Sequence, residues 1–216
     1  MNEKDGPALV LPGAPLEDAD LRALTLGDMA VLAAAMLRHG LENPSSPLRK
    51  PAFATVGTTG APAVRTVILR SADLAARKLG IFTDARSRKV ADLESNPFAE
   101  LLFYDPACDI QLRLSGRAEV RPGDEAAWAS AAPPSRRAYL VTAPPGTPSL
   151  EPVSGLPADV AGIIPSLERM EEGRVNFAYV EIVISGADIV VLSRAGHRRA
   201  RIRYRADGEH AEWLVP

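Results

Sequence analysis

The chain has 216 residues, 46% of them hydrophobic and 24% charged, which is the composition of a globular protein with an ordinary hydrophobic core and excludes wholesale disorder. Its 25 basic and 27 acidic residues nearly cancel, so no global field draws it to nucleic acid or to an anionic membrane, and any recognition of anions must be local. A single cysteine, Cys108, excludes an intramolecular disulfide and a cysteine-based metal cluster.

The beginning of the chain predicts neither a membrane span nor a secretory signal. The longest apolar run, residues 29–37, is too short to cross a bilayer, and the first five residues are polar. We therefore expect a cytoplasmic protein. Residues 1–20, with three prolines and two glycines, are predicted to form a flexible arm, and residues 21–216 to form a single domain.

Apolar residues at helical spacing predict a first helix, for which Gly40 is a suitable stop. Helices are predicted at residues 25–38, 85–95, 124–131, 135–141 and 167–175. Asp84 is the expected cap of the second of these helices. The segment 144–157 holds five prolines and two glycines, the composition of an exposed loop or lid.

Short runs rich in valine, isoleucine and threonine predict strands, the first two of which form a hairpin. Strands are predicted at residues 53–56, 63–69, 78–83, 99–104, 109–120, 177–184, 188–192, 199–204 and 212–215. They follow one another without long crossover helices, which disfavours a doubly wound parallel sheet. We expect a mainly β protein of the α+β class, built on an antiparallel barrel whose closure would remove exposed edges.

Three groups of basic residues could bind an anion. The first is the strand segment from Arg65 to Arg70. Alternation predicts that Arg65 and Val67 point to one side of it and Thr66, Ile68 and Arg70 to the other. The segment can be interpreted as a half-buried strand with charged ends or as one wall of an anion site.

The second group is Ser87, Arg88 and Lys89, in the predicted first turn of a helix. Cations normally avoid a helix N-terminus, where the macrodipole is already positive, so two cations there cost stability unless an anion joins them. Free backbone N–H groups and two cations after a strand are a suitable seat for phosphate. The alternative interpretation is two solvated charges on an exposed helix.

The third group comprises Arg199, Arg201, Arg203 and Arg205, which would share one face of a strand and repel one another. Solvation accounts for most of them, and one or two could face a bound anion. A nucleic-acid patch is an alternative that the net charge of −2 does not favour.

Other chemistry finds little support in the sequence. The three histidines have no spacing typical of a zinc site, and no glycine-rich phosphate loop or nucleophile elbow is present. We predict no metal. If the protein is an enzyme, the reactive atom belongs to a cofactor.

The basic groups, in this order, resemble the pyridoxamine 5′-phosphate oxidase family of FMN-binding split barrels over about residues 50–206. The pattern comprises Arg65-Thr66-Val67-Ile68-Leu69-Arg70, Phe82-Thr83-Asp84, Ser87-Arg88-Lys89, Asn96-Pro97, the segment from Ile110 to Gly116, and Arg201. The resemblance implies an antiparallel Greek-key split β-barrel, a homodimer with FMN at the subunit interface, and an FMN-dependent oxidoreductase that acts through flavin N5 on a small-molecule substrate.

The resemblance also implies the cofactor-binding residues, position by position. The flavin and its phosphate would be lined by Arg65, Thr66, Val67, Ile68, Leu69, Arg70, Phe82, Thr83, Ser87, Arg88, Lys89, Gln111 and Arg201. Among these, Arg88 and Lys89 would bind the phosphate and Gln111 would hydrogen-bond the flavin edge, since an amide both donates and accepts.

The departures from the family concern the substrate. The segment from Trp128 to Ser135 lacks the tyrosine and arginine that grip the substrate phosphate in pyridoxamine-phosphate oxidases, and an Arg-Leu-His triplet is replaced by His197-Arg198-Arg199. His197 and Arg199 are the candidates for contacting a substrate. The alternative is a flavin-binding protein without turnover, such as a sensor or stress-response carrier.

Overall fold

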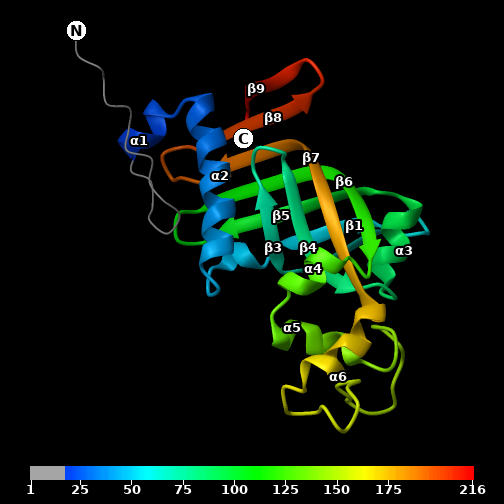
Figure 1. Ribbon diagram of the computed structural model, residues 1–216. Helices are drawn as coiled ribbons and strands as arrows, with labels where there is room; N and C mark the ends of the chain where they lie inside the picture. Colours follow the sequence, from blue (N-terminus) through cyan, green and yellow to red (C-terminus); the bar gives the residue numbers. More distant parts are fainter. Residues whose placement is uncertain (1–17) are drawn as a thin grey trace.

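The computed structural model describes the backbone of residues 18–216 and the side chains of residues 21–216 (Figure 1). The first seventeen positions of the predicted arm lie outside the described residues, and the remaining three belong to helix α1 (Asp18–Ala23). None of the helices in the described part is long and apolar enough to cross a membrane.

Nine strands form one sheet, and all of its neighbouring strands run antiparallel. They are β1 (Ala52–Val56), β2 (Pro62–Thr66), β3 (Leu69–Asp73), β4 (Lys78–Asp84), β5 (Phe98–Asp105), β6 (Ile110–Pro122), β7 (Phe177–Val191), β8 (Arg198–Arg205) and β9 (Gly208–Leu214). The α-helices after α1 are α2 (Leu26–Glu42), α3 (Arg88–Ser95), α4 (Glu125–Ser130), α5 (Pro133–Arg137) and α6 (Leu167–Glu171). Short 3₁₀ turns are η1 (Pro47–Arg49), η2 (Ala138–Leu140) and η3 (Glu172–Asn176).

The long strand β7 divides the sheet. One of its edges pairs with β6 along nearly its whole length. On the other edge, residues 177–183 pair with β4 and residues 186–191 pair with β8. The order is β2-β1-β5-β6-β7-β4-β3, with β8 and β9 branching from β7. This is the predicted antiparallel α+β class, in a split form, because one edge of β7 serves two different strands.

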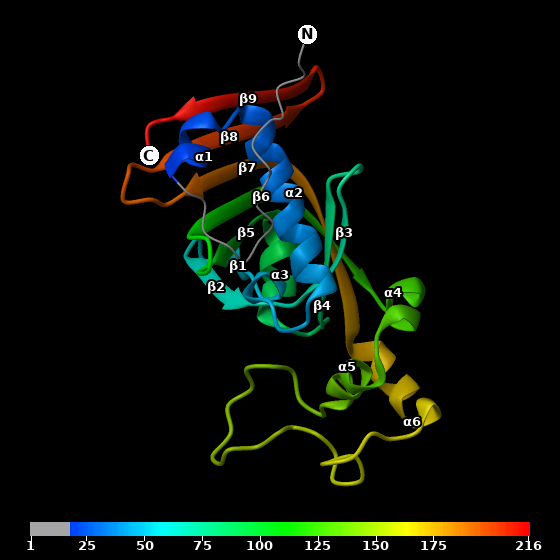
Figure 2. The same cartoon turned by 90° about the vertical axis from the view of Figure 1, so that its left-hand side faces the viewer.

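Helix α2 lies across one face of the sheet, as Figures 1 and 2 both show. It begins at a capping box in which Thr25 and Asp28 satisfy each other's backbone N–H groups. Its buried face, with Met29, Leu32 and Met36, contributes to the one large core that also contains the inner side chains of the strands. Helices α4–α6 and the segment between them extend from the end of the sheet where β7 begins.

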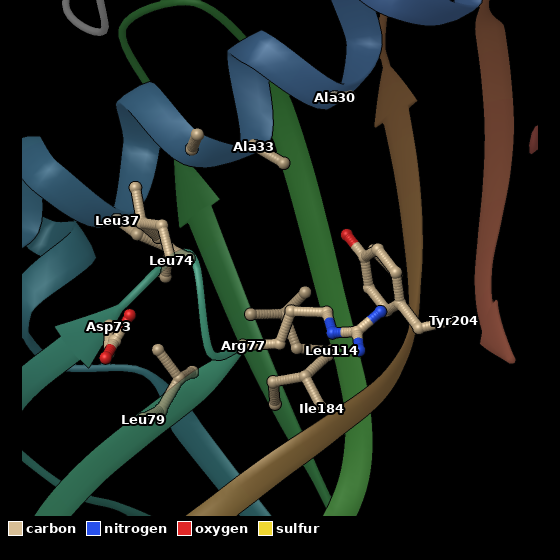
Figure 3. A pocket seen from close by; sticks show the side chains of 12 residues that line it. Ala30, Ala33, Leu37, Asp73, Leu74, Arg77, Leu79, Leu114, Ile184 and Tyr204 are labelled. Atoms are coloured by element: carbon tan, nitrogen blue, oxygen red, sulfur yellow. The ribbon is translucent and has the colours of Figure 1, made fainter. Parts of the chain in front are cut away.

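An apolar pocket of about 90 Å³ remains between α2 and the sheet (Figure 3). Alanines of α2, among them Ala30 and Ala33, leave space above Leu114 and Ile184. Arg77 has a left-handed backbone (φ 56°), and its guanidinium lies 4.9 Å from the centre of the Tyr204 ring at this pocket.

Three predicted strands differ from the structure. The predicted strand 63–69 is two strands, because the Val67 N–H donates to Pro51 O (3.0 Å) between them and Leu69 turns into the core to pair with Ile81. The predicted strands 177–184 and 188–192 are the single strand β7.

Asp84 and Gly40 have roles other than the predicted ones of helix cap and helix stop. Asp84 does not cap α3, because the Arg86 side chain binds its carboxylate (2.7 and 3.0 Å) and the helix begins only at Arg88, with Ser87 as N-cap. Gly40 does not end α2: a Cβ there would lie 2.7 Å from Leu48 O, so this glycine allows the close approach of η1. Full closure is also absent among the described strands, since β2, β3 and β9 each pair with only one other strand.

Candidate functional site

The turn between β4 and α3 is fixed by local hydrogen bonds. The Asp84 carboxylate accepts from the N–H of Arg86 (2.8 Å), and the Ser87 N–H donates to Asp84 O (3.0 Å). Ser87 occupies the N-cap position of α3, yet its hydroxyl makes no capping hydrogen bond. The hydroxyl is therefore available for other partners at the start of the helix.

Those partners are Thr83 and Lys89. Lys89 Nζ donates to Thr83 Oγ1 (2.9 Å) and to Ser87 Oγ (3.2 Å), and the two buried hydroxyls lie 3.2 Å apart. No carboxylate lies within 4.0 Å of this ammonium group among residues 21–216. Burial, and next the positive charge of Arg65, lower the pKa of Lys89. A half-buried cation with neutral partners is a suitable receptor for an anion.

Arg65 reaches the same place from β2. Its Nη1 donates to Thr55 Oγ1 (2.7 Å) and Phe53 O (3.2 Å), and its Nη2 lies 3.4 Å from Asp92 Oδ2. Arg88, at the first position of α3, is exposed. Because the charge of Arg65 acts on Lys89 and its guanidinium reaches Asp92 of α3, the structure brings these two cations together near the start of α3.

Between Arg65 and Arg70, the side chains alternate between the core and the surface. Val67 and Leu69 are buried in the core, whereas Thr66 and Ile68 are exposed. A ligand along this segment could therefore meet Val67 and Leu69 only through their backbone.

Arg70 contacts helix α5 and Phe82 of β4. Its guanidinium stacks 5.1 Å above the Phe82 ring, and its Nη2 donates to Ser135 Oγ (3.1 Å). Its Nε is buried without a hydrogen-bond partner, and burial lowers the pKa of this arginine. Phe82 is fixed in turn by an edge-on contact with Phe177 (5.1 Å). An aromatic face beside an unsatisfied N–H donor suits a planar, polar ring.

The remaining predicted residues lie on the outer face of the sheet, the surface opposite the core. Cross-strand register aligns Leu102, Arg113, Asp188 and Arg201 in one row across β5, β6, β7 and β8. Gln111 stands on the same face between the core residues Ile110 and Leu112. Within one chain, Gln111 and Arg201 therefore do not lie beside Arg65, Arg88 and Lys89, which we call the cation cluster.

The two candidate substrate residues have partners of their own. Arg199 binds Asp188 through two nitrogens (3.0 and 2.9 Å), and this hydrogen-bonded carboxylate raises the pKa of Arg199. His197 is exposed, and its Nδ1 accepts from the Ser193 N–H (3.1 Å) in the turn before β8.

Sequence reasoning missed Thr55 and Asp92, the partners of Arg65. Two signals could have indicated them. Alternation along residues 53–56 places Thr55 on the inner side with Phe53, and Asp92 follows Arg88 and Lys89 by one helical turn, which predicts a shared face.

Comparison with known proteins adds independent findings. Residues 31–122 match the family model described as pyridoxamine 5′-phosphate oxidase, FMN-binding domain. A pyridoxine/pyridoxamine 5′-phosphate oxidase of Anaeromyxobacter dehalogenans is 45% identical over 75 residues, 35% of this chain and 37% of that protein. The corresponding oxidase 2 of Arabidopsis thaliana is 40% identical over 68 residues, 32% of this chain and 34% of its own. The matched segments thus span about a third of these relatives.

Solved structures share the fold over more of the chain. A pyridoxamine 5′-phosphate oxidase-related, FMN-binding protein of Nostoc punctiforme aligns with a TM-score of 0.65 at 21% identity, over 85% of this chain and 94% of its own. PhzG of Burkholderia lata, solved with tetrahydrophenazine-1-carboxylic acid, aligns with a TM-score of 0.65 at 17% identity, over 94% of this chain and 100% of its own.

The matched region contains every predicted cofactor residue from Arg65 to Gln111, and the resemblance noted in the sequence is confirmed. Arg201 and both candidate substrate residues lie outside it. Residues 31–122 therefore match the FMN-binding domain of the pyridoxamine 5′-phosphate oxidase family, and the overall fold is the one that these solved structures share.

Proposed function

We propose that this protein is an FMN-dependent oxidoreductase whose phosphate seat is the cation cluster at the start of α3. The observation that carries the proposal is Lys89, held by two buried hydroxyls, without a carboxylate partner within residues 21–216, and beside a second cation, Arg65. A phosphate dianion would supply the missing negative charge and accept hydrogen bonds from all of these groups.

Each element has a defined part in holding FMN. Lys89, Arg65 and Arg88 would bind the phosphate, with the hydroxyls of Ser87 and Thr83 and the N-terminus of α3 as further donors. The backbone of residues 66–69 would run along the cofactor, and Arg70 and Phe82 would lie toward the flavin ring. When bound, FMN supplies the redox chemistry through its N5 atom, and the protein supplies orientation and a site shielded from water.

A homodimer is part of this proposal. Gln111 and Arg201 lie on the outer face, on the opposite side of the sheet from the core, so one chain does not present them to its own cation cluster. A second copy docked by its outer face could present them. That face exposes large apolar side chains, with 66% of Val64, 63% of Phe98 and 37% of Leu102 accessible, which favours burial against another protein surface.

The substrate would be a small molecule that reaches the flavin, with His197 and Arg199 as candidate contacts. The relatives' names suggest a vitamin B6 phosphate. One observation favours the second candidate function, flavin binding without turnover: Asp188 already holds Arg199 through two hydrogen bonds, so Arg199 would have to leave this carboxylate to bind a substrate anion.

The first experiment is a titration of the purified, flavin-free protein with FMN and with riboflavin, followed by flavin fluorescence. We expect FMN to bind much more tightly than riboflavin. Lys89→Ala should weaken FMN binding by about 1.5–3 kcal/mol, the contribution of a charge-assisted hydrogen bond, and should leave riboflavin binding unchanged. Lys50→Ala removes an exposed lysine elsewhere and is the matched control. Equal affinity for the two flavins would contradict the phosphate seat.

The second experiment separates the two candidate functions. Oxygen-dependent turnover of pyridoxamine or pyridoxine phosphate by the FMN-loaded protein would establish an oxidase. Bound FMN that neither compound reduces under anaerobic conditions would favour flavin binding without this activity.

A further inference from the structure

We propose that Asp92 is a positioning residue of the phosphate seat, which acts through Thr55 to hold Arg65 toward the ligand. The inference rests on the proposed function, because it concerns the same seat. Asp92 lies in α3, one helical turn after the cations, and its side chain is completely buried.

Thr55 connects the two charged groups. Its hydroxyl donates to Asp92 Oδ2 (2.8 Å) and accepts from Arg65 Nη1 (2.7 Å), while Arg65 Nη2 lies 3.4 Å from the same carboxylate oxygen. A hydroxyl that both donates and accepts fixes the direction of its neighbours. Phe53 O accepts a further N–H of Arg65 (3.2 Å). The guanidinium is thus held at one end, and its remaining N–H donors stay available for a phosphate oxygen.

The carboxylate is not satisfied by these contacts. Asp92 Oδ1 is buried and has no hydrogen-bond partner among the described residues. A Cβ at Gly57 would lie 3.8 Å from this oxygen and 3.9 Å from Arg88 Nη2, so the carboxylate faces the side of the seat where the exposed arginine lies. Burying a carboxylate with incomplete pairing costs stability. The burial of the Asp92 carboxylate beside these cations is explained by its effect on them, which is to orient Arg65.

Two effects of Asp92 on a bound phosphate oppose each other. Its negative charge repels the phosphate, and its oxygen atoms orient the arginine that attracts it. Asparagine at this position keeps an oxygen acceptor for Thr55 and Arg65 but removes the charge, whereas alanine removes both. The positioning role therefore predicts that asparagine rescues binding and alanine does not.

The test compares Asp92→Asn and Asp92→Ala by titration with FMN and riboflavin. We expect Asp92→Asn to bind FMN at least as tightly as the natural protein, and Asp92→Ala to bind it about tenfold more weakly or worse, the loss of one charge-assisted hydrogen bond. Riboflavin, which lacks the phosphate, should bind all three proteins equally. Equal FMN affinity of the two variants, or equal losses for FMN and riboflavin, would overturn the inference.

A second pair of variants keeps the test valid if alanine at position 92 prevents folding. Thr55→Ser retains the connecting hydroxyl and Thr55→Val replaces it with a methyl group of similar volume. We expect only Thr55→Val to lose FMN affinity, and an equal affinity of the two variants would count against the inference. If the natural protein itself does not prefer FMN to riboflavin, the proposed function fails; if it does and the paired variants do not differ, only the role of Asp92 fails.

Discussion

The surroundings of Lys89 suit a bound anion. An exposed lysine at the start of a helix would be solvated, and its position would have little meaning. Here the ammonium group lies against two buried hydroxyls, and burial and the charge of Arg65 make its charged form less favourable. A negative ligand offsets both effects, because its charge attracts the two cations at once.

The lowered pKa of Lys89 leads to a prediction about pH. In the free protein this lysine loses its proton at a lower pH than an exposed lysine does. The charged form binds the phosphate dianion, so FMN affinity should be constant between the second pKa of the phosphate, about 6, and the lowered pKa of Lys89. It should fall as the pH rises through the pKa of Lys89, with protons taken up on binding in that range. Calorimetric titration in buffers of different ionisation enthalpy measures this uptake.

Lys89→Arg is the matched variant, since arginine keeps its charge throughout the accessible range. It should move the decline in FMN affinity to higher pH. An identical pH profile for Lys89→Arg and the natural protein would show that another group causes the decline.

At the scale of elements, the place where β6 meets β7 tolerates little change. The register of these strands shifts between Ser115 and Gly116, and a Cβ on Gly116 would lie 2.4 Å from Val183 O, a backbone atom that cannot move aside cheaply. Gly116→Ala should therefore destabilise the protein by roughly 1–3 kcal/mol, measured by urea unfolding.

A glycine-to-alanine substitution in α2 should have the opposite effect on stability. Gly27 is exposed near the start of this helix, and its nearest neighbour to a new Cβ is Thr25 Oγ1 at 3.6 Å. Gly27→Ala should stabilise the protein by up to about 1 kcal/mol, because alanine has the higher helix propensity. Equal effects at the two positions would mean that the close approach at Gly116 is relieved by backbone movement.

These elements also show what the sequence could and could not predict. Helix α2 and the β1–β2 hairpin follow local patterns and were predicted within a few residues. The break of the predicted strand 63–69 depends on a hydrogen bond from Val67 to Pro51, and the cap of α3 depends on the competition of Arg86 for Asp84. Such competition is decided by neighbours in space and leaves little trace in local composition.

The candidate site also contains some residues that the sequence could predict and others that it could not. The cations near α3 were predictable because their position contradicts helix electrostatics. The partners of Arg65, Thr55 and Asp92, come from another strand and from the buried side of a helix. Alternation and helical spacing indicate the faces on which they lie, but not that they contact this arginine. The face that presents Gln111 and Arg201 follows from strand alternation, but whether a second chain covers that face is a property of the assembly.

At the scale of the whole molecule, the proposed dimer gives a prediction about Phe98. Its side chain is largely exposed on the outer face, so Phe98→Lys should fold normally, yet it should prevent docking of a second copy and thereby weaken FMN binding. Analytical ultracentrifugation and the FMN titration measure the two effects.

Val175→Lys is the control, because Val175 is also apolar and exposed (79%, against 63% for Phe98) but lies in η3 and not on a strand of the sheet. It should change neither mass nor affinity. A natural protein that is monomeric with FMN bound, or a Phe98→Lys variant that remains dimeric, would contradict the proposed assembly.

The division of β7 has a mechanical consequence for such a dimer. Its first half borders β4, which carries Phe82 and Thr83, and its second half borders β8, which carries Arg201. In each copy of the proposed dimer, the single strand β7 would then connect residues that line its own flavin pocket with strand β8, whose Arg201 would reach the flavin pocket of the other copy. Filling one pocket would stiffen a component of the other, so the two flavins should bind cooperatively, with stepwise constants that depart from the statistical ratio of two independent sites.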